Sequence, residues 1–232
     1  MLPSVSLKVQ QHRTAELPRR KPWVSSPAAA RTPPPPPSPP SRWTRRWPPS
    51  PATTPSTPPP AAIDTAHSSI GFTVRHAMVT NVRGGFGDYA GSLHLDGADP
   101  ARSTASIDVK IASVDTGIAD RDAHLRGEDF FAAEAFPLMT FRSTRAARVG
   151  GDTYRITGDL TIRDVTRPLT IDLEFNGSAT DVYGSERVGF EGSAEILRSE
   201  WGLTWNAALE AGGVMVSDKV KLTFDISAVK QG

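Results

Sequence analysis

Apolar and polar residues alternate repeatedly along the chain from about residue 61 onwards. In the segment 169–175, for example, Leu, Ile, Leu and Phe alternate with Thr, Asp and Glu. Because successive side chains of a β-strand point to opposite faces, this alternation predicts strands that are buried on one face only. Eight such strands are predicted, within residues 69–76, 82–95, 105–111, 139–141, 154–163, 169–175, 187–196 and 219–226.

Strands with one apolar and one polar face are typical of antiparallel sheets. Eight of them, without a large helical partner, bury their apolar faces best by closing into a barrel, which also removes exposed edges. We therefore expect an all-β, eight-stranded antiparallel barrel that is wide enough to hold one small ligand. Two segments interrupt the strand pattern, and helices are expected over 118–131 and, more briefly, over 201–209, as lids or plugs at a barrel mouth.

Residues 1–60 differ sharply in composition from the rest of the chain. They hold 18 of the 21 prolines and no glycine, with nine basic residues against one acidic residue, whereas residues 61–232 hold 17 basic and 24 acidic residues. Proline-rich sequence favours polyproline II and cannot build a packed core. We expect a disordered Pro/Arg-rich tail (1–60) and one folded domain (61–232). The tail could instead bind a proline-recognition domain or an acidic surface.

Several classes of protein are disfavoured by the composition. The chain has no cysteine, so thiolate chemistry and disulfides are excluded. No apolar run reaches the length of a transmembrane helix, and no signal peptide is readable, so the chain reads as cytoplasmic. A periplasmic or secreted location is the alternative if the N-terminus is misassigned. No nucleic-acid partner is expected because the folded part is acidic. The spacing of the histidines matches no metal-binding motif, so no metal site is expected. No other cofactor is expected either.

The candidate ligand-binding residues are aromatic and apolar side chains on the inward faces of the predicted strands and in the interrupting segments. Aromatic residues are often simply core, but they would line a cavity if the barrel is hollow. Gly158, Gly192 and Ala194 fall on apolar faces and favour a hollow barrel. His76 also falls on an apolar face and could contact a ligand head group. The candidates are Phe72, Val74, His76, Phe86, Phe131, Phe141, Leu160, Phe190, Trp201 and Trp205.

Ordered short motifs over residues 64–228 resemble the YceI-like family, whose polyisoprenoid-binding-like members have a lipocalin-like barrel. Each motif is weak alone, but their order and spacing together are specific. They are Asp64 with His67-Ser68, Phe72 and His76, the Gly84–Phe86 region, Ser113–Gly117, Arg121–Leu125, Phe130-Phe131, Phe136-Pro137, Thr140-Phe141, Gly158–Ile162, Val165–Pro168, Arg198, Trp201–Leu203 and Trp205-Asn206.

The resemblance implies that a long amphiphile binds along the barrel axis. A polyisoprenoid, an isoprenoid quinone precursor or a fatty acid derivative would be carried or sequestered, with no catalysis. Burying ten methylene equivalents would contribute on the order of 8 kcal/mol, whereas association costs about 4–15 kcal/mol. Long ligands should therefore bind more tightly than short ones. The sequence leaves open whether the chain forms a homodimer.

Two other functions remain as alternatives. The first is a barrel enzyme in which His76, or the cluster Arg121, Asp122 and His124, transfers protons for an amphiphilic substrate. Aspartates near a helix start also stabilise its free N–H groups, which is the structural interpretation of the same cluster. The second alternative is a filled barrel that serves as an interaction module through its tail. No nucleophile elbow or phosphate loop supports a hydrolase or a nucleotide enzyme.

Overall fold

The computed structural model describes residues 60–210 and 212–231. The tail predicted over 1–60 lies outside the described residues except for Pro60, and β1 begins directly after it. The strands are β1 (Ala61–Ile63), β2 (Ser69–His76), β3 (Thr80–Phe86), β4 (Tyr89–His94), β5 (Thr104–Lys110), β6 (Val114–Asp115), β7 (Leu138–Gly150), β8 (Thr153–Ile162), β9 (Val165–Thr180), β10 (Glu186–Leu197) and β11 (Val216–Lys230). The helices are α1 (Ala119–Arg126) and the 3-10 turns η1 (Thr65–His67), η2 (Pro100–Arg102), η3 (Ile111–Ser113) and η4 (Arg198–Trp201).

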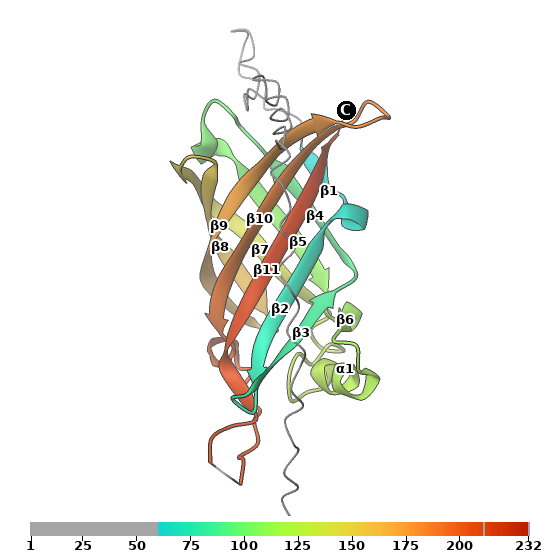
Figure 1. Ribbon diagram of the computed structural model, residues 1–232, viewed down its shortest axis with the longest axis vertical. Helices are drawn as coiled ribbons and strands as arrows, with labels where there is room; N and C mark the ends of the chain where they lie inside the picture. Colours follow the sequence, from blue (N-terminus) through green and yellow to red (C-terminus); the bar gives the residue numbers. More distant parts are fainter. Residues whose placement is uncertain (1–59, 211, 232) are drawn as a thin grey trace, which may run out of the picture. The chain divides into compact units, whose positions relative to one another are not determined.

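The strands close into one antiparallel barrel (Figure 1). The ring runs β1-β4-β5-β7-β8-β9-β10-β11, and Ala61 of β1 pairs with Lys230 of β11 to close it. η1 separates β1 from β2, and a short break at Gly87 separates β3 from β4, so each pair continues one chain segment. The eight predicted strands correspond to these eight segments, and the expected eight-stranded antiparallel barrel is confirmed.

The ring changes partners toward the end that carries α1. There β11 leaves β1 and pairs with β2, through Val220 opposite Val74, and β2 in turn pairs with β3. The strand β3 then pairs with the two-residue strand β6, beside which α1 packs (Figure 1). The barrel wall is therefore continuous at one end and is completed by helical and irregular segments at the other.

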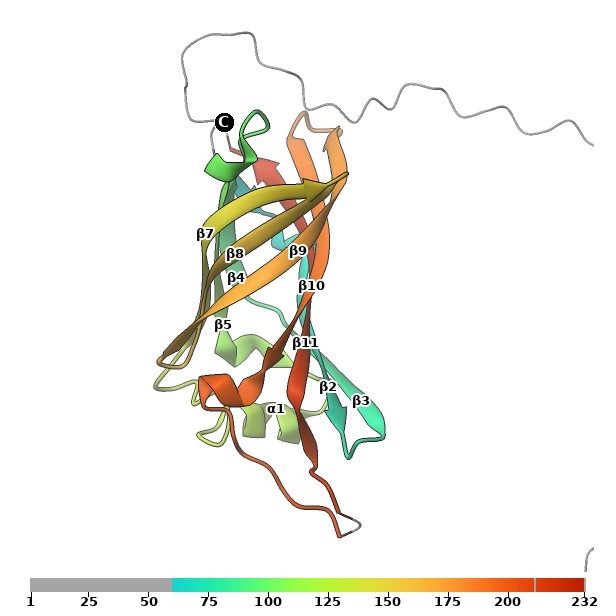
Figure 2. The ribbon, with the colours of Figure 1, turned by 90° about the vertical axis from the view of Figure 1, so that its left-hand side faces the viewer.

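A second interruption of the wall lies between β9 and β10. Their pairing ends at Asp172 opposite Ser193, although β9 stays paired with β8 as far as Val165 and β10 stays paired with β11 as far as Leu197. The two strands diverge beyond this point, and the chain turns into η4 beside them (Figure 2). Arg167 of β9 donates from Nε to the Glu200 carbonyl of η4 over 3.2 Å, which links the two segments across the divergence.

Both helix predictions need correction. α1 ends at Arg126, well before residue 131, because Gly127 adopts an extended conformation and its N–H returns to the His124 carbonyl. Residues 201–209 are not a helix. The 3-10 turn η4 precedes them and ends where Gly202 takes a positive φ of 75°, a conformation that glycine adopts at little cost.

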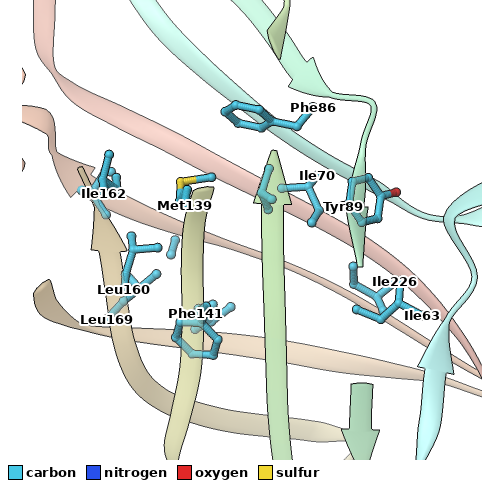
Figure 3. Packing of buried hydrophobic residues seen from close by; sticks show 14 of the residues in the cluster. Ile63, Ile70, Phe86, Tyr89, Met139, Phe141, Leu160, Ile162, Leu169 and Ile226 are labelled. Atoms are coloured by element: carbon cyan, nitrogen blue, oxygen red, sulfur yellow. The ribbon is translucent and has the colours of Figure 1, made fainter. Parts of the chain in front are cut away.

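The core consists of the inward side chains of the strands (Figure 3). Phe141 and Leu160 lie together on β7 and β8, whereas Phe86, Ile70 and Tyr89 lie together elsewhere on the wall. The outer faces carry exposed ion pairs, such as Arg155 with Asp172 at 2.7 Å. The described residues hold no helix with the length and hydropathy needed to cross a bilayer.

Candidate functional site: an apolar cavity in the barrel

The barrel encloses a cavity of about 310 Å³, at the lower end of the range typical of small-molecule sites. Its lining comes mainly from the inward positions of β4, β5 and β7 to β11, as the period-two pattern requires. Ile107, Ile171 and Leu222 represent this lining, which consists mostly of aliphatic and aromatic side chains. A surface of this kind binds apolar chains, because it offers few polar partners.

Three aromatic rings from adjacent strands form one part of the lining. The ring of Tyr154 on β8 lies 6.4 Å from that of Phe175 on β9 and 6.3 Å from that of Phe190 on β10, both nearly perpendicular. Phe175 and Phe190 are 5.4 Å apart. Edge-to-face contacts of this kind fix the rings in place, so they form a rigid part of the wall.

Polar groups gather at the end of the cavity formed by the 95–104 segment and the β7–β8 turn. Arg148 lies 3.6 Å from Asp152, and its guanidinium carbon lies 5.9 Å from the centre of the Tyr154 ring. Across the same end, Asp96 lies 3.4 Å from Arg102. Half of the Arg148 side chain is exposed to solvent, so we take this end as the mouth of the cavity.

The opposite end is closed by η4 and the segment that follows it. Trp201 is buried, and its Nε1 donates to the Leu160 carbonyl of β8 over 3.0 Å. The buried guanidinium of Arg198 donates to the carbonyls of Leu203, Trp205, Val216 and Ser217. Burial lowers the pKa of Arg198 below its ordinary value. The cavity is thus largely apolar, with its charged lining residues at the end opposite η4.

Four of the ten candidate ligand-binding residues line this cavity. Phe86, Phe141, Leu160 and Phe190 come from four different strands and are all buried. Their role as ligand contacts stays a prediction, but the structure brings them to one cavity.

The other six candidates do not line the cavity. Phe72 and Phe131 pack on either side of Phe86, with ring separations of 5.8 and 6.1 Å. Val74 and His76 lie on the part of β2 that extends past the closed ring to pair with β3. The remaining two, Trp201 and Trp205, lie at the closed end, where Trp205 packs 5.3 Å from Phe130. The part of β2 that pairs with β3 beyond the closed ring carries Val74 and His76 away from the cavity.

The glycines that favoured a hollow barrel do not themselves leave space. A Cβ on Gly158 would lie 2.5 Å from the ring of Phe141, and one on Gly192 would lie 2.7 Å from Leu173. Neighbouring side chains therefore fill the space beside both glycines. The cavity arises from the width of the barrel. The hollow barrel was therefore predicted from Gly158 and Gly192 for the wrong reason, because these glycines do not create the space.

The proposed acid–base cluster is held by local contacts. Asp122 is buried and accepts hydrogen bonds from the N–H and hydroxyl of Thr116, whereas Arg121 donates to the same threonine. His124 is exposed, bonds to Asp129 at 2.9 Å and stacks edge-on against Phe130 and Trp205. None of these side chains lines the cavity. Within the described residues, no group of three or more potential ligands could hold a metal ion.

The sequence analysis did not identify the residues that lie at the mouth of the cavity. Tyr154 and Phe175 alternate correctly with their neighbours but were not chosen as candidates. Arg148 follows a β-bulge in β7, where the register shifts between Ser143 and Arg145, so counting every second residue from Phe141 places it on the wrong face. Asp96 belongs to a loop, where no periodicity applies.

Comparison with known proteins agrees with this architecture. The family model for the YceI-like domain matches residues 62–228. A UPF0312 protein from Photorhabdus laumondii is 40% identical over 130 residues, which cover 56% of this chain and 67% of that protein.

Solved structures extend the comparison to the fold. The Campylobacter jejuni YceI protein is 32% identical, with a TM-score of 0.60 over 73% of this chain and 96% of that chain. A polyisoprenoid binding domain from Saccharophagus degradans, 16% identical, shares the fold with a TM-score of 0.56 over 75% of this chain and 99% of that chain. With its barrel, its apolar cavity and the match over residues 62–228, the chain belongs to the YceI-like domain family.

Proposed function

We propose that the chain binds a long-chain amphiphilic lipid inside the barrel, for carriage or sequestration and without catalysing a reaction. The observation that carries this proposal is the apolar cavity with its charged groups confined to one end. An amphiphile matches that arrangement, because its tail replaces water along the lining while its head stays at the mouth. The lipid classes are those named above: a polyisoprenoid, an isoprenoid quinone precursor or a fatty acid derivative.

Two observations support this function over its alternatives. In a barrel that served only as an interaction module, an apolar cavity of about 310 Å³ would lose packing contacts without binding a ligand. The Saccharophagus degradans protein that shares this fold is a polyisoprenoid binding domain, which agrees with a lipid ligand. The enzyme alternative rests on His76, which does not line the cavity, or on Arg121, Asp122 and His124, which have the local partners described above.

Native mass spectrometry of the purified full chain, with organic extraction of any bound material, tests the proposal. A long-chain lipid recovered in stoichiometric amount, or taken up when a long-chain isoprenoid or fatty acid derivative is added, is the expected result. A protein that carries none and takes up none would refute it.

Two variants show where the lipid binds. Phe141→Asp places a charge on the lining, and Ile156→Trp fills the cavity from β8, so both should lose lipid retention. Thr170→Trp, on the outer face of β9, should retain the lipid and controls for the added bulk. Retention by Ile156→Trp, with its fold verified by circular dichroism, would place the lipid outside the cavity.

A further inference from the structure

The charged side chains of the cavity are few and lie together at its mouth. Among the described residues, those that line the cavity and carry a formal charge are Asp96, Arg148 and Asp152. The lining at the mouth therefore holds one cation and two anions, and a second cation, Arg102, lies beside Asp96 outside the lining. The lining deeper in the barrel holds no charged residue. Ser103, Thr104 and Tyr154, whose side chains carry hydroxyl groups, also belong to the lining.

Asp96 is fixed in its anionic form by the loop that carries it. One carboxylate oxygen accepts hydrogen bonds from the backbone N–H groups of Ala98 and Asp99 at 3.0 and 2.9 Å, and the other lies 3.4 Å from Arg102. The Asp99 N–H, which favours the charged form, lowers the pKa of Asp96 below its ordinary value. Only 14% of the Asp96 side chain is exposed, whereas half of the Arg102 side chain is exposed.

Arg148 already has partners in the protein. Its Nε donates to the Gly151 carbonyl at 2.6 Å, and its Nη2 lies 3.6 Å from Asp152. The same guanidinium lies over the ring of Tyr154. A ligand anion at this cation would share it with the Asp152 carboxylate, with Asp96 on the lining of the same mouth.

We propose that the barrel selects amphiphiles with an uncharged polar head group and rejects those with a carboxylate or phosphate, and that Asp96 and Asp152 set this preference. This inference rests on the proposed function and narrows its ligand class. Within residues 60–210 and 212–231, the cations at the mouth are Arg102 and Arg148, and each already faces a carboxylate. An anionic head would share a cation with one of these carboxylates and would be repelled by both in a partly buried site. An uncharged head with hydroxyl, amide or carbonyl groups can hydrogen-bond to the hydroxyls of the lining without this repulsion.

Pairs of ligands with the same apolar tail, one with an uncharged and one with an anionic head group, test the inference. Palmitamide is compared with palmitic acid, and farnesol with farnesyl phosphate, by displacement of the uncharged probe N-phenylnaphthylamine from the full chain at neutral pH and low ionic strength. Each uncharged ligand is expected to bind at least about tenfold more tightly than its anionic counterpart, since charges a few ångströms apart in a partly buried site interact strongly.

Charge-removing variants then identify the residues responsible. Asp96→Asn and Asp152→Asn should each reduce the discrimination to about threefold or less. Glu174→Gln removes an equal charge from the exposed outer face of β9 and should leave the discrimination unchanged. Thermal unfolding of each variant verifies its fold.

The outcomes separate this inference from the proposed function. Equal or tighter binding of the anionic ligands would overturn the inference and leave the lipid-binding function standing. Discrimination that persists in both aspartate variants would show that other groups set it, which also overturns the inference. If no ligand displaces the probe, the proposed function itself fails, and the inference fails with it.

Discussion

At the scale of single residues, Gly158 shows how closely the barrel wall packs. Its Cα lies under the ring of Phe141, and an added Cβ would also meet the Arg142 carbonyl at 2.5 Å. The ring can rotate away, but the backbone carbonyl belongs to the neighbouring strand and cannot move without breaking the ladder. The glycine therefore has a steric role in the sheet.

We predict that Gly158→Ala destabilises the fold by about 1–3 kcal/mol, the range for overpacking a filled site. Urea unfolding followed by tryptophan fluorescence measures the difference. Gly87→Ala is the matched control, because a Cβ there meets nothing within 4 Å, and it should change the free energy of unfolding by less than about 0.5 kcal/mol. A neutral Gly158→Ala would show that β7 and β8 can separate freely at this point.

Arg187 joins two distant carboxylates near the mouth end of the barrel. It donates to Asp64, which precedes η1, and to Asp181 in the β9–β10 turn, the latter at 2.8 Å. The Arg187 guanidinium, followed by His67, lowers the pKa of Asp64 from 3.8 to about 2. The pKa of Asp181 is also lowered, chiefly by the same guanidinium.

These shifts predict the acid sensitivity of the domain. A carboxyl whose pKa is lower in the folded state contributes stability that is present above its unfolded pKa of about 3.9 and is lost as the pH falls toward its folded value. The melting temperature should therefore fall between about pH 4 and pH 2, and this fall should be smaller in Arg187→Gln. Arg75→Gln, which removes a cation that donates to the Val79 carbonyl, is the control. Identical pH profiles for wild type and Arg187→Gln would contradict the prediction.

At the scale of elements, η4 and the segment after it act as the plug of the closed end. The strands β9 and β10 diverge there, and Trp201 and Arg198 tie the chain to the barrel through carbonyl groups. The planar guanidinium of Arg198 reaches four carbonyls at once, which a lysine ammonium cannot do in the same geometry.

We predict that Arg198→Lys lowers the free energy of unfolding by about 2–3 kcal/mol, because buried carbonyls lose charge-assisted hydrogen bonds. Hydrogen exchange should also become faster in residues 202–210, since this segment loses its anchor. Arg167→Lys removes an exposed hydrogen bond to the Glu200 carbonyl and should have a much smaller effect. Unchanged exchange in Arg198→Lys would mean that packing of Trp201 alone holds the plug.

At the scale of the whole molecule, the closed end gives the cavity a fixed depth. The free energy of burying an apolar chain grows by about 0.8 kcal/mol for each methylene, close to a fourfold change in affinity. Within a series of primary alkyl amides, affinity should rise with chain length and then level off once the cavity is full. Isothermal titration calorimetry measures this series, and affinity that is independent of length would indicate binding at the surface.

The cytoplasmic location and the homodimer stay predictions.

The sequence by itself determined the barrel. Alternation such as that of residues 169–175 reports which face of each strand is buried, and eight half-buried strands have few other ways to cover their apolar faces. It also identified Phe86, Phe141, Leu160 and Phe190 as inward residues, since period two is a local property. The motifs over 64–228 indicated the family, which the match over 62–228 confirms.

Only the tertiary structure decided where the cavity lies and which residues form its mouth. The bulge in β7 turns Arg148 inward, and the partner exchange of β2 moves Val74 and His76 away from the cavity. The loop residue Asp96 reaches the same mouth as Asp152 although more than fifty residues separate them. Bulges, strand exchange and loop closure depend on contacts between distant segments, and no local pattern records them.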